Sequence, residues 1–203
     1  MSEGLEALRA RYPIPEIMPD VPMDYTRSEP TGWCSGENRQ LFARVCNDQT
    51  RVIIDGGSFL GLSAWWFLRT APNATIICID HWKGSREHQR GAMAGKLPTL
   101  YETFLCNLWE WRTRIIPVRA DSVAGMQEVA ALGIEPDVVY IDWSHDAESV
   151  CRDLTTAIKC FPQATVIGDD WTWDSVRKGV QLATEPRGIS VENFRTCYRL
   201  NLQ

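Results

Sequence analysis

The stretch "RVIIDGGSFLGLSAWWFLRT" (Arg51–Thr70) decides the fold. It starts with a short run of branched apolar residues that ends at Asp55, which is typical of a buried strand. Glycines follow, and "LGLSAWWFLRT" is then long and apolar enough for a helix that covers the strand. A strand that passes through a glycine-containing turn into a helix predicts the beginning of an α/β domain.

The same alternation continues along the chain. Further strand-like runs are "ATIICID", "RIIPVRAD", "DVVYID" and "ATVIGDD", and two more, "GISVENF" and "TCYRLNL", close the sequence. Helical patterns precede or separate these runs: "SGENRQLFARVC", "LPTLYETFLCNLWEWR", "SVAGMQEVAALG", "AESVCRDLTTAIKCF" and "DSVRKGVQLAT". Ser35 and Ser122 are expected to cap two of these helices. Strands rich in Val and Ile that alternate with helices indicate a parallel sheet covered on both faces.

The N-terminal part has a different character. Tyr12–Trp33 contains five prolines, which favour an extended arm or irregular cap over a helix. We therefore expect residues 1–34 to form an arm or cap and residues 35–203 to form one domain. An arm of this kind is expected either to cover a binding site or to mediate contacts in a homo-oligomer, and the sequence leaves both open.

Composition excludes several classes of protein. The formal net charge of −5 argues against a nucleic-acid binder, which needs a basic surface. No apolar run reaches the length of a membrane span, and the first residues lack the apolar core of a signal peptide. The seven cysteines are scattered and form no Cys-x-x-Cys pair, so free thiols in a reducing cytoplasm are expected.

Acidic residues mark the ends of five predicted strands: Asp55, Asp80, Asp121, Asp142 and the pair Asp169–Asp170. Each alone is readily explained as a helix cap. However, the carboxyl ends of parallel strands lie along one edge, where α/β proteins bind their ligands. Five such ends would make this edge negative, which favours a cationic ligand, a ligand rich in hydroxyl or amine donors, or a bound metal.

The turn "DGGSFLG" discriminates between two cofactors. Its glycines do not have the G-x-G-x-x-G spacing of dinucleotide-binding proteins. In addition, the carboxylate of Asp55 would repel a pyrophosphate placed at the following helix. S-adenosylmethionine carries an ammonium and a sulfonium and no phosphate, so it suits this charge, and Asp80 is placed to accept its ribose hydroxyls.

Five stretches, in this order and spacing, resemble class I S-adenosylmethionine-dependent methyltransferases: "VIIDGGSFLGLSAWWF", "ICIDHWKGS", "VRADSV", "DVVYIDWSHDAESVCRDL" and "VIGDDWTWDSVRKGV". The likeness is greatest to small-molecule O-methyltransferases that include the macrolide-sugar (macrocin-type) enzymes. It implies a Rossmann-like three-layer sandwich, with a mostly parallel seven-stranded sheet and an antiparallel closing strand. The sequence departs from these relatives at Ser144, where many carry an acid.

The resemblance also implies which residues hold the cofactor. They are Asp55, Gly57, Ser58, Gly61, Ser63, Asp80, His81, Trp82, Asp121, Ser122 and Asp142. Among them, His81 and Trp82 are expected to flank the adenosine. The glycine-containing segment His81–Lys96 is expected to be either a lid over the cofactor or a solvated loop.

The fourth and fifth strand ends suggest the chemistry. Asp142, Asp169 and Asp170 offer the oxygen ligands that Mg²⁺ prefers, and a cation would relieve their mutual repulsion. His145 is the candidate general base, because its ordinary pKa lies near neutral pH. The alternatives are a helix-entry histidine and carboxylates that only cap or support the fold. Trp143, Trp171 and Trp173 surround these acids, and we expect them either to stack an acceptor or to pack in the core.

Together these features predict a metal-assisted O-methyltransferase whose partner is a small hydroxylated molecule, with His145 and Asp142 as catalytic residues. Neither a nucleic-acid partner nor a membrane partner is expected. The alternative is a non-catalytic S-adenosylmethionine-binding protein with a regulatory or scaffolding role, since a fold does not fix the chemistry.

Overall fold

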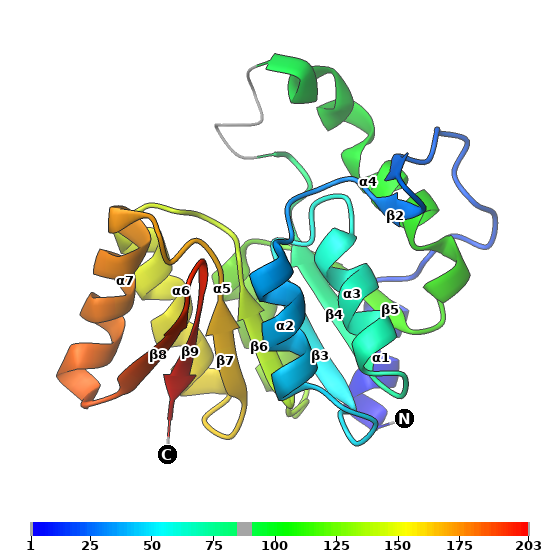
Figure 1. Cartoon of the computed structure of the whole chain (residues 1–203). Coiled ribbons are helices and arrows are strands. Elements are labelled where there is room, and N and C mark those ends of the chain that lie inside the picture. The colour runs from blue at the N-terminus through cyan, green and yellow to red at the C-terminus, as the bar shows by residue number, and fades with distance from the viewer. Residues whose placement is uncertain (1, 85–90, 203) are drawn as a thin grey trace.

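The fold is built around one seven-stranded sheet, seen in the computed structural model, which describes residues 2–84 and 91–202 (Figure 1). The strands are β3 (Val52–Gly56), β4 (Thr75–Asp80), β5 (Ile115–Arg119), β6 (Val138–Ile141), β7 (Thr165–Gly168), β8 (Ser190–Phe194) and β9 (Cys197–Asn201). Their order in the sheet is β5-β4-β3-β6-β7-β9-β8. β3 to β7 pair in parallel, whereas β9 is antiparallel to both β7 and β8. The predicted fold class is confirmed.

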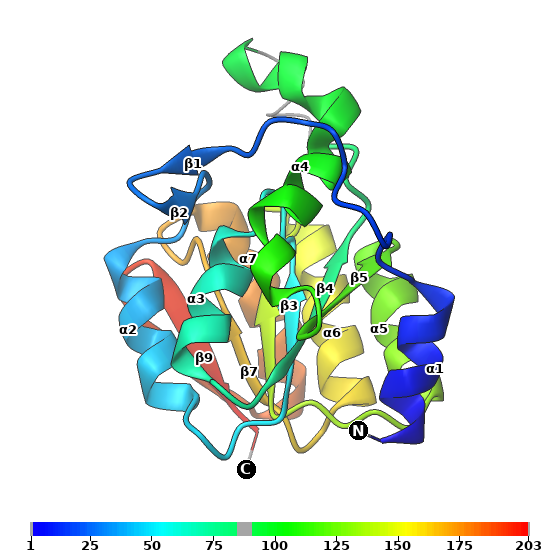
Figure 2. The same ribbon diagram turned by 90° about the vertical axis from the view of Figure 1, so that its right-hand side faces the viewer.

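Helices cover both faces of the sheet (Figure 2). They are α1 (Glu3–Arg11), α2 (Gly36–Val45), α3 (Leu62–Thr70), α4 (Leu100–Asn107), α5 (Ser122–Ala131), α6 (Ala147–Cys160) and α7 (Asp174–Thr184). α2, α3 and α4 pack on one face, and α1, α5, α6 and α7 pack on the other. Because side chains alternate along a strand, Ile53 joins one core and Ile54 joins the other, and both are fully buried. Burial of each such side chain stabilises the fold by about 1.5–3 kcal/mol.

The strand order locates the binding edge. β3 lies in the middle, with β4 on one side and β6 on the other. The chain therefore winds in one direction from β3 to β5 and crosses back to continue through β6 and β7. At such a switch point the loops after neighbouring strands separate and leave a crevice at the carboxyl ends.

The N-terminal residues include a helix that we did not predict. α1 buries Leu5 and Leu8 against the core. Its Arg9 donates to the carbonyl oxygens of Thr113 and Ile115, each at 3.0 Å. Ile115 belongs to β5, an edge strand, so α1 satisfies and covers part of an edge that would otherwise be open to pairing.

The proline-rich arm then crosses the carboxyl edge of the sheet to reach α2 (Figure 2). It contains only a small hairpin of β1 (Tyr25–Thr26) and β2 (Glu29–Pro30), as the prolines led us to expect. The arm is anchored by Asn107, whose Oδ1 accepts from the backbone of Asp24 and whose Nδ2 donates to the carbonyl of Leu60, both at 2.8 Å.

The other helices and strands lie close to their predicted positions, except that one predicted helix is divided and a short turn follows α7. Ser35 caps α2 by accepting from the backbone of Asn38, as expected. The predicted long helix instead divides into η1 (Gly91–Thr99), α4 and η2 (Trp109–Trp111). Pro98 lies inside η1, where its missing N–H precludes a regular α-helical bond. A short turn, η3 (Glu185–Arg187), extends α7. Among the described residues, no helix is both long and apolar enough to cross a membrane.

Candidate active site

Two cavities meet at the carboxyl edge of the sheet. The larger has a volume of about 1130 Å³ and extends past the ends of β4 and β5. The smaller has a volume of about 370 Å³ and lies between the N-terminal arm and the ends of β6 and β7. Of the described residues, five line both cavities: Gly57, Phe59, Asp142, Trp143 and His145. These residues form a common wall, so a molecule in one cavity would lie next to a molecule in the other.

The turn after β3 makes part of this wall. Gly57 has a φ of +83°, and a Cβ at this position would lie 2.0 Å from the carbonyl oxygen of Asp142. Only glycine allows the turn to approach the end of β6 this closely. Ser58 and Ser63, predicted to contact the cofactor, line the smaller cavity.

Asp55 supports the turn from its buried side. It is fully buried, lines neither cavity, and its Oδ2 accepts from Ser58 Oγ at 2.6 Å. Burial raises the pKa of Asp55 to about 6. Gly61, which we also expected to contact the cofactor, instead faces Leu108 and Phe104 with a φ of +96°. Both residues shape the turn without lining a cavity.

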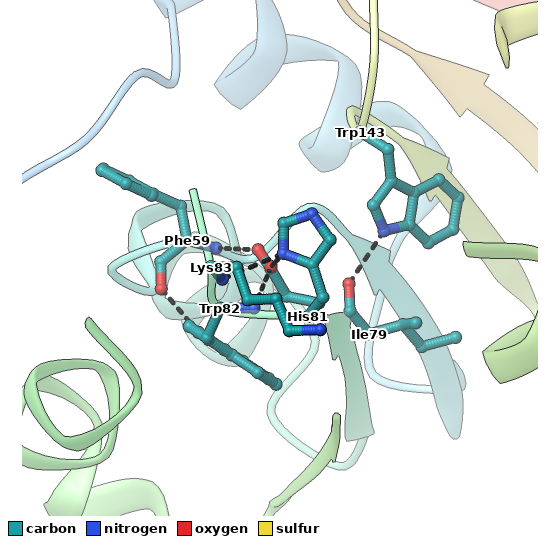
Figure 3. A network of polar contacts seen from close by, with 7 residues as sticks. Phe59, Ile79, His81, Trp82, Lys83 and Trp143 are labelled. Atoms are coloured by element: carbon teal, nitrogen blue, oxygen red, sulfur yellow. Dashed lines mark hydrogen bonds and ion pairs between the residues drawn. The ribbon is translucent and has the colours of Figure 1, made fainter. Parts of the chain in front are cut away.

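The end of β4 holds a second set of contacts (Figure 3). Asp80 lines the larger cavity and accepts from the backbone N–H of Phe59 at 2.9 Å and of Trp82 at 2.7 Å. Trp143 spans the neighbouring strand ends and donates from Nε1 to the carbonyl of Ile79 at 3.0 Å. The carboxylate of Asp80 is therefore held in one orientation by two backbone donors.

The two residues after Asp80 have different positions. His81, which we expected to flank the adenosine, lines the larger cavity. Trp82 is only 4% exposed and lines neither cavity, because its ring packs against Tyr101 and Phe104. Its Nε1 donates to the carbonyl of Phe59 at 2.9 Å. Trp82 thus fixes the turn that carries Phe59, whereas we expected it beside the adenosine.

The start of α5 forms the far end of the larger cavity. Asp121 and Ser122, which we expected to contact the cofactor, both line it. Ser122 does not cap α5, although we expected it to, because the N-cap position is occupied by Asp121. The side chain of Asp121 makes no capping hydrogen bond. Ser122 Oγ instead donates to Asp153 of α6 at 2.7 Å. The segment His81–Lys96, predicted to be a lid or a solvated loop, starts after β4, and its residues His81 and Gly84 line the same cavity. Residues 85–90 of this segment lie outside the described part of the chain.

An acidic cluster lies where the two cavities meet. His145 Nε2 is 2.9 Å from Asp170 Oδ2 and 3.6 Å from Asp142 Oδ1. Among the described residues, the donor atoms of these three lie within 4.8 Å of one another, close enough to hold one metal ion. Burial raises the pKa of Asp142. The hydrogen bonds to Asp142 and Asp170 raise the pKa of His145, so this arrangement favours the imidazolium form.

Asp169 differs from the metal set that we predicted. It lines the smaller cavity, but its Oδ2 accepts from Asn38 Nδ2 at 2.5 Å and from the Tyr140 hydroxyl at 3.4 Å. The same hydroxyl lies 3.4 Å from Asp142 Oδ2. The structure therefore groups two of the predicted carboxylates with His145 and holds the third against α2.

Aromatic side chains surround the smaller cavity. Trp33 is 64% exposed and Trp173 is 45% exposed, although both line it. The Trp173 ring lies 4.9 Å from that of His145, and the Trp33 ring lies 5.4 Å from that of Phe59. Trp171, by contrast, packs against Tyr198 and lines neither cavity.

Two residues that line the cavities, Phe59 and Trp33, were not named among the predicted site residues. Phe59 adopts a left-handed backbone with a φ of +48°, which is uncommon for a bulky residue. Trp33 comes from the arm, and its place beside the strand ends depends on how the arm folds back. For Phe59 a signal was available, since the middle of a turn after a strand is where an α/β protein approaches its ligand.

Comparison with known proteins adds to this geometry. Residues 54–171, more than half of the chain, match a family model described as a methyltransferase domain. No curated protein matches the sequence.

Several solved structures share the fold. An O-methyltransferase from Bacillus cereus in complex with SAH has a TM-score of 0.58 at 16% identity, covering 98% of this chain and 87% of that chain. A precorrin-6y C5,15-methyltransferase from Geobacter metallireducens has a TM-score of 0.55 at 16% identity, with coverage of 81% and 86%. The calicheamicin methyltransferase has a TM-score of 0.53 at 13% identity, with coverage of 79% and 76%. At these identities the likeness establishes the fold.

Proposed function

Because this chain belongs to the methyltransferase-domain family, we propose that it transfers a methyl group from S-adenosylmethionine to a hydroxyl group of a small molecule. The observation that carries this proposal is the wall shared by the two cavities. Methyl transfer is an in-line displacement, so donor and acceptor must approach from opposite sides and meet. Two cavities that meet at one wall provide this arrangement, with the cofactor in the larger and the acceptor in the smaller. This assignment places Ser58 and Ser63, which we expected to contact the cofactor, on the acceptor side of the shared wall.

The charges of the larger cavity suit the cofactor. Its described lining contains four aspartates and one arginine: Asp80, Asp121, Asp142, Asp146 and Arg152. A sulfonium and an ammonium are favoured in such a negative environment, whereas phosphates are not. Asp80, oriented by two backbone donors, supports the assignment of the ribose hydroxyls to its carboxylate.

The smaller cavity suits a small acceptor. Its volume of about 370 Å³ lies near the lower end of the range for small-molecule sites. Trp33 and Trp173 offer flat faces on which a sugar or an aromatic ring can stack. We assign the chemistry to residues 35–203 and the covering of the acceptor to the arm of residues 1–34.

A divalent cation is compatible with the acidic cluster. Asp142 and Asp170 bring two carboxylates together beside His145, and their oxygens are the ligands that Mg²⁺ prefers. We propose that these carboxylates hold Mg²⁺. When bound, such a cation supplies positive charge that lowers the pKa of an acceptor hydroxyl.

His145 has the task of accepting the hydroxyl proton. Its Nε2 is the atom that lies against Asp170, and it accepts a proton only as the neutral imidazole. The two carboxylates oppose this form by raising the pKa of His145, so compensation of their charge is a condition for the proposed role. The resemblance to metal-dependent relatives supports the same assignment.

Calorimetry of S-adenosylmethionine binding tests the proposal. The titration is made with Mg²⁺ and with a chelator, on the wild type, on Asp80→Asn, and on Asp174→Asn as control. Asp174 is an exposed acid at the start of α7 and lines neither cavity. We expect Asp80→Asn to weaken binding by about tenfold or more, as for the loss of a charged hydrogen bond. Asp174→Asn is expected to have no effect.

Turnover then separates the two candidate functions. The enzyme is incubated with S-adenosylmethionine, Mg²⁺ and a set of hydroxylated sugars and phenols, and formation of S-adenosylhomocysteine is measured. Metal-dependent turnover that is lost in His145→Ala supports the proposal. Binding without turnover on any acceptor would favour the non-catalytic alternative, and no binding at high protein concentration would exclude both.

A further inference from the structure

One carboxylate in the wall of the smaller cavity is held by uncharged groups. Asp169 follows β7 and lines this cavity. Its Oδ2 accepts from Asn38 Nδ2 at 2.5 Å and from the Tyr140 hydroxyl at 3.4 Å. In the part of the chain that the structure describes, no lysine, arginine or histidine forms an ion pair with Asp169. Asp170 differs, because His145 Nε2 lies 2.9 Å from its carboxylate.

The two donors fix the carboxylate of Asp169 at the cavity wall. Asn38 lies in α2 and Tyr140 lies in β6, and both side chains are fully buried. Leaving a buried donor unpaired is costly, which keeps the carboxylate in place. An ionised carboxylate offers about four acceptor positions on its two oxygens. Asp169 therefore remains able to accept hydrogen bonds from a molecule in the cavity.

The rest of the described lining favours positive charge. It contains two further carboxylates, one imidazole and four aromatic rings: Asp142, Asp170, His145, Trp33, Phe59, Trp143 and Trp173. The described lining contains no lysine or arginine. Mg²⁺ held by Asp142 and Asp170 would offset their charge and leave that of Asp169. A buried charge without a partner is costly, and aromatic faces attract cations. The cavity is therefore suited to a cationic group and unsuited to an anionic one.

We propose that the acceptor is a hydroxylated amine, such as an amino sugar or a phenol with an amino side chain, and that Asp169 binds its ammonium group. The inference rests on the proposed function, because it names the class of molecule in the acceptor cavity. The ammonium group donates to Asp169 and has no lone pair with which to accept a methyl group. The hydroxyl oxygen therefore forms the bond to the methyl carbon as the carbon–sulfur bond breaks, and His145 takes the hydroxyl proton.

The consequence is a selectivity with an attractive and a repulsive part. Asp169 attracts an ammonium group. A carboxylate or phosphate on the acceptor meets the like charge of Asp169, and the described wall has no lysine or arginine to offset the repulsion. A neutral acceptor of the same shape is neither attracted nor repelled by this charge. We therefore expect affinity to fall from the amine to the neutral compound and from the neutral compound to the acid.

Calorimetry with matched compounds tests this order. The enzyme is loaded with S-adenosylhomocysteine and Mg²⁺ at neutral pH, and each compound is titrated into it. One series is glucosamine, glucose and glucuronate, and the other is tyramine, p-ethylphenol and p-hydroxyphenylacetate. We expect the wild type to bind the amine of at least one series about tenfold or more tightly than the neutral compound, the equivalent of one charged hydrogen bond. The acid should bind more weakly than the neutral compound.

Asp169→Asn separates the charge of the residue from its shape. The amide keeps the size of the carboxylate and one acceptor oxygen, and it removes the negative charge. We expect this variant to lower the preference for the amine by about tenfold, while the affinities for the neutral compound and for Mg²⁺ stay unchanged. Asp174→Asn is the control, since Asp174 is an exposed acid that lines neither cavity, and it should keep the wild-type preference.

Each outcome bears on the proposal. It is overturned if the amine binds no better than the neutral compound in both series, or if Asp169→Asn keeps the preference. A loss of Mg²⁺ affinity in this variant would assign Asp169 to the metal and overturn its role toward the amine. Thermal unfolding establishes whether the variant is folded, and the wild-type order alone decides if it is not. Methyl transfer to neutral or acidic acceptors in preference to amines overturns the inference and leaves the proposed function intact, whereas a wild type that binds no S-adenosylhomocysteine removes both.

Discussion

Replacing Gly57 by alanine tests the close approach between the turn after β3 and the end of β6. The added Cβ would lie 2.0 Å from the carbonyl oxygen of Asp142, and the backbone at Gly57 has a φ of +83°. A left-handed conformation costs an ordinary residue about 1–2 kcal/mol. Forcing an extra methyl group into a packed region adds about 1–3 kcal/mol. We therefore expect Gly57→Ala to lower the free energy of unfolding by about 2–5 kcal/mol.

Gly133→Ala provides the matched control. Gly133 also has a positive φ, +65°, but no atom lies within 4 Å of the Cβ that would be added. It should lose only the backbone contribution, about 1–2 kcal/mol. Urea denaturation followed by circular dichroism measures both variants, and their difference reports the contact with Asp142. A loss in Gly57→Ala no larger than that in Gly133→Ala would refute the reasoning.

Three further predictions concern the site and its support. The pKa of Asp55 is raised to about 6, so its contribution to stability is present below about pH 4 and lost as pH rises through 6. Asp55→Asn should remove about 2 kcal/mol of this pH dependence, measured by urea titrations at pH 4.5 and 7.5, and identical pH profiles would contradict it. His145→Asn should reduce turnover by at least about 100-fold while leaving S-adenosylmethionine affinity unchanged. Mn²⁺ titration of that variant shows whether the imidazole also binds metal. Trp173→Ala should change the free energy of unfolding by about 0.5 kcal/mol or less, because the Trp173 side chain is 45% exposed. The same substitution should raise the KM for the acceptor. An unchanged KM would show that Trp173 does not belong to the acceptor site.

Local patterns were enough to predict most of the sheet. Apolar runs that end in an acid gave the positions of β3, β4, β6 and β7, because buried parallel strands have few polar residues and their ends face the ligand. α1 was missed because only Leu5 and Leu8 of its nine residues are buried, and two positions make a weak periodic signal. It is held by packing of these two leucines in the core and by Arg9, which donates to the carbonyl oxygens of Thr113 and Ile115, more than a hundred residues away.

The site was predictable at the level of strand ends and not at the level of side-chain partners. The sequence places Asp169 and Asp170 together, but only the fold brings Asn38 against Asp169 and leaves Asp170 to His145. Trp82 has the sequence position of a cofactor contact, yet burial against Tyr101 and Phe104 decides its place. Such choices depend on packing between distant elements, which no local pattern contains.

The two exposed tryptophans have a consequence for how such proteins diversify. Trp33 and Trp173 both lie outside residues 54–171, the part of the chain that matches the methyltransferase-domain family. The shared segment supplies the strand ends, the acidic cluster and the wall next to the larger cavity, whereas the smaller cavity, the proposed acceptor side, is completed by Trp33 and Trp173 from the flanking segments. Under the proposed function, the arm and the residues that follow position 171 in the loop after β7 can therefore differ between family members while Asp169 and Asp170 stay in place. A chimaera that carries the arm and residues 172–173 from another family member would inherit its acceptor preference on the present sheet.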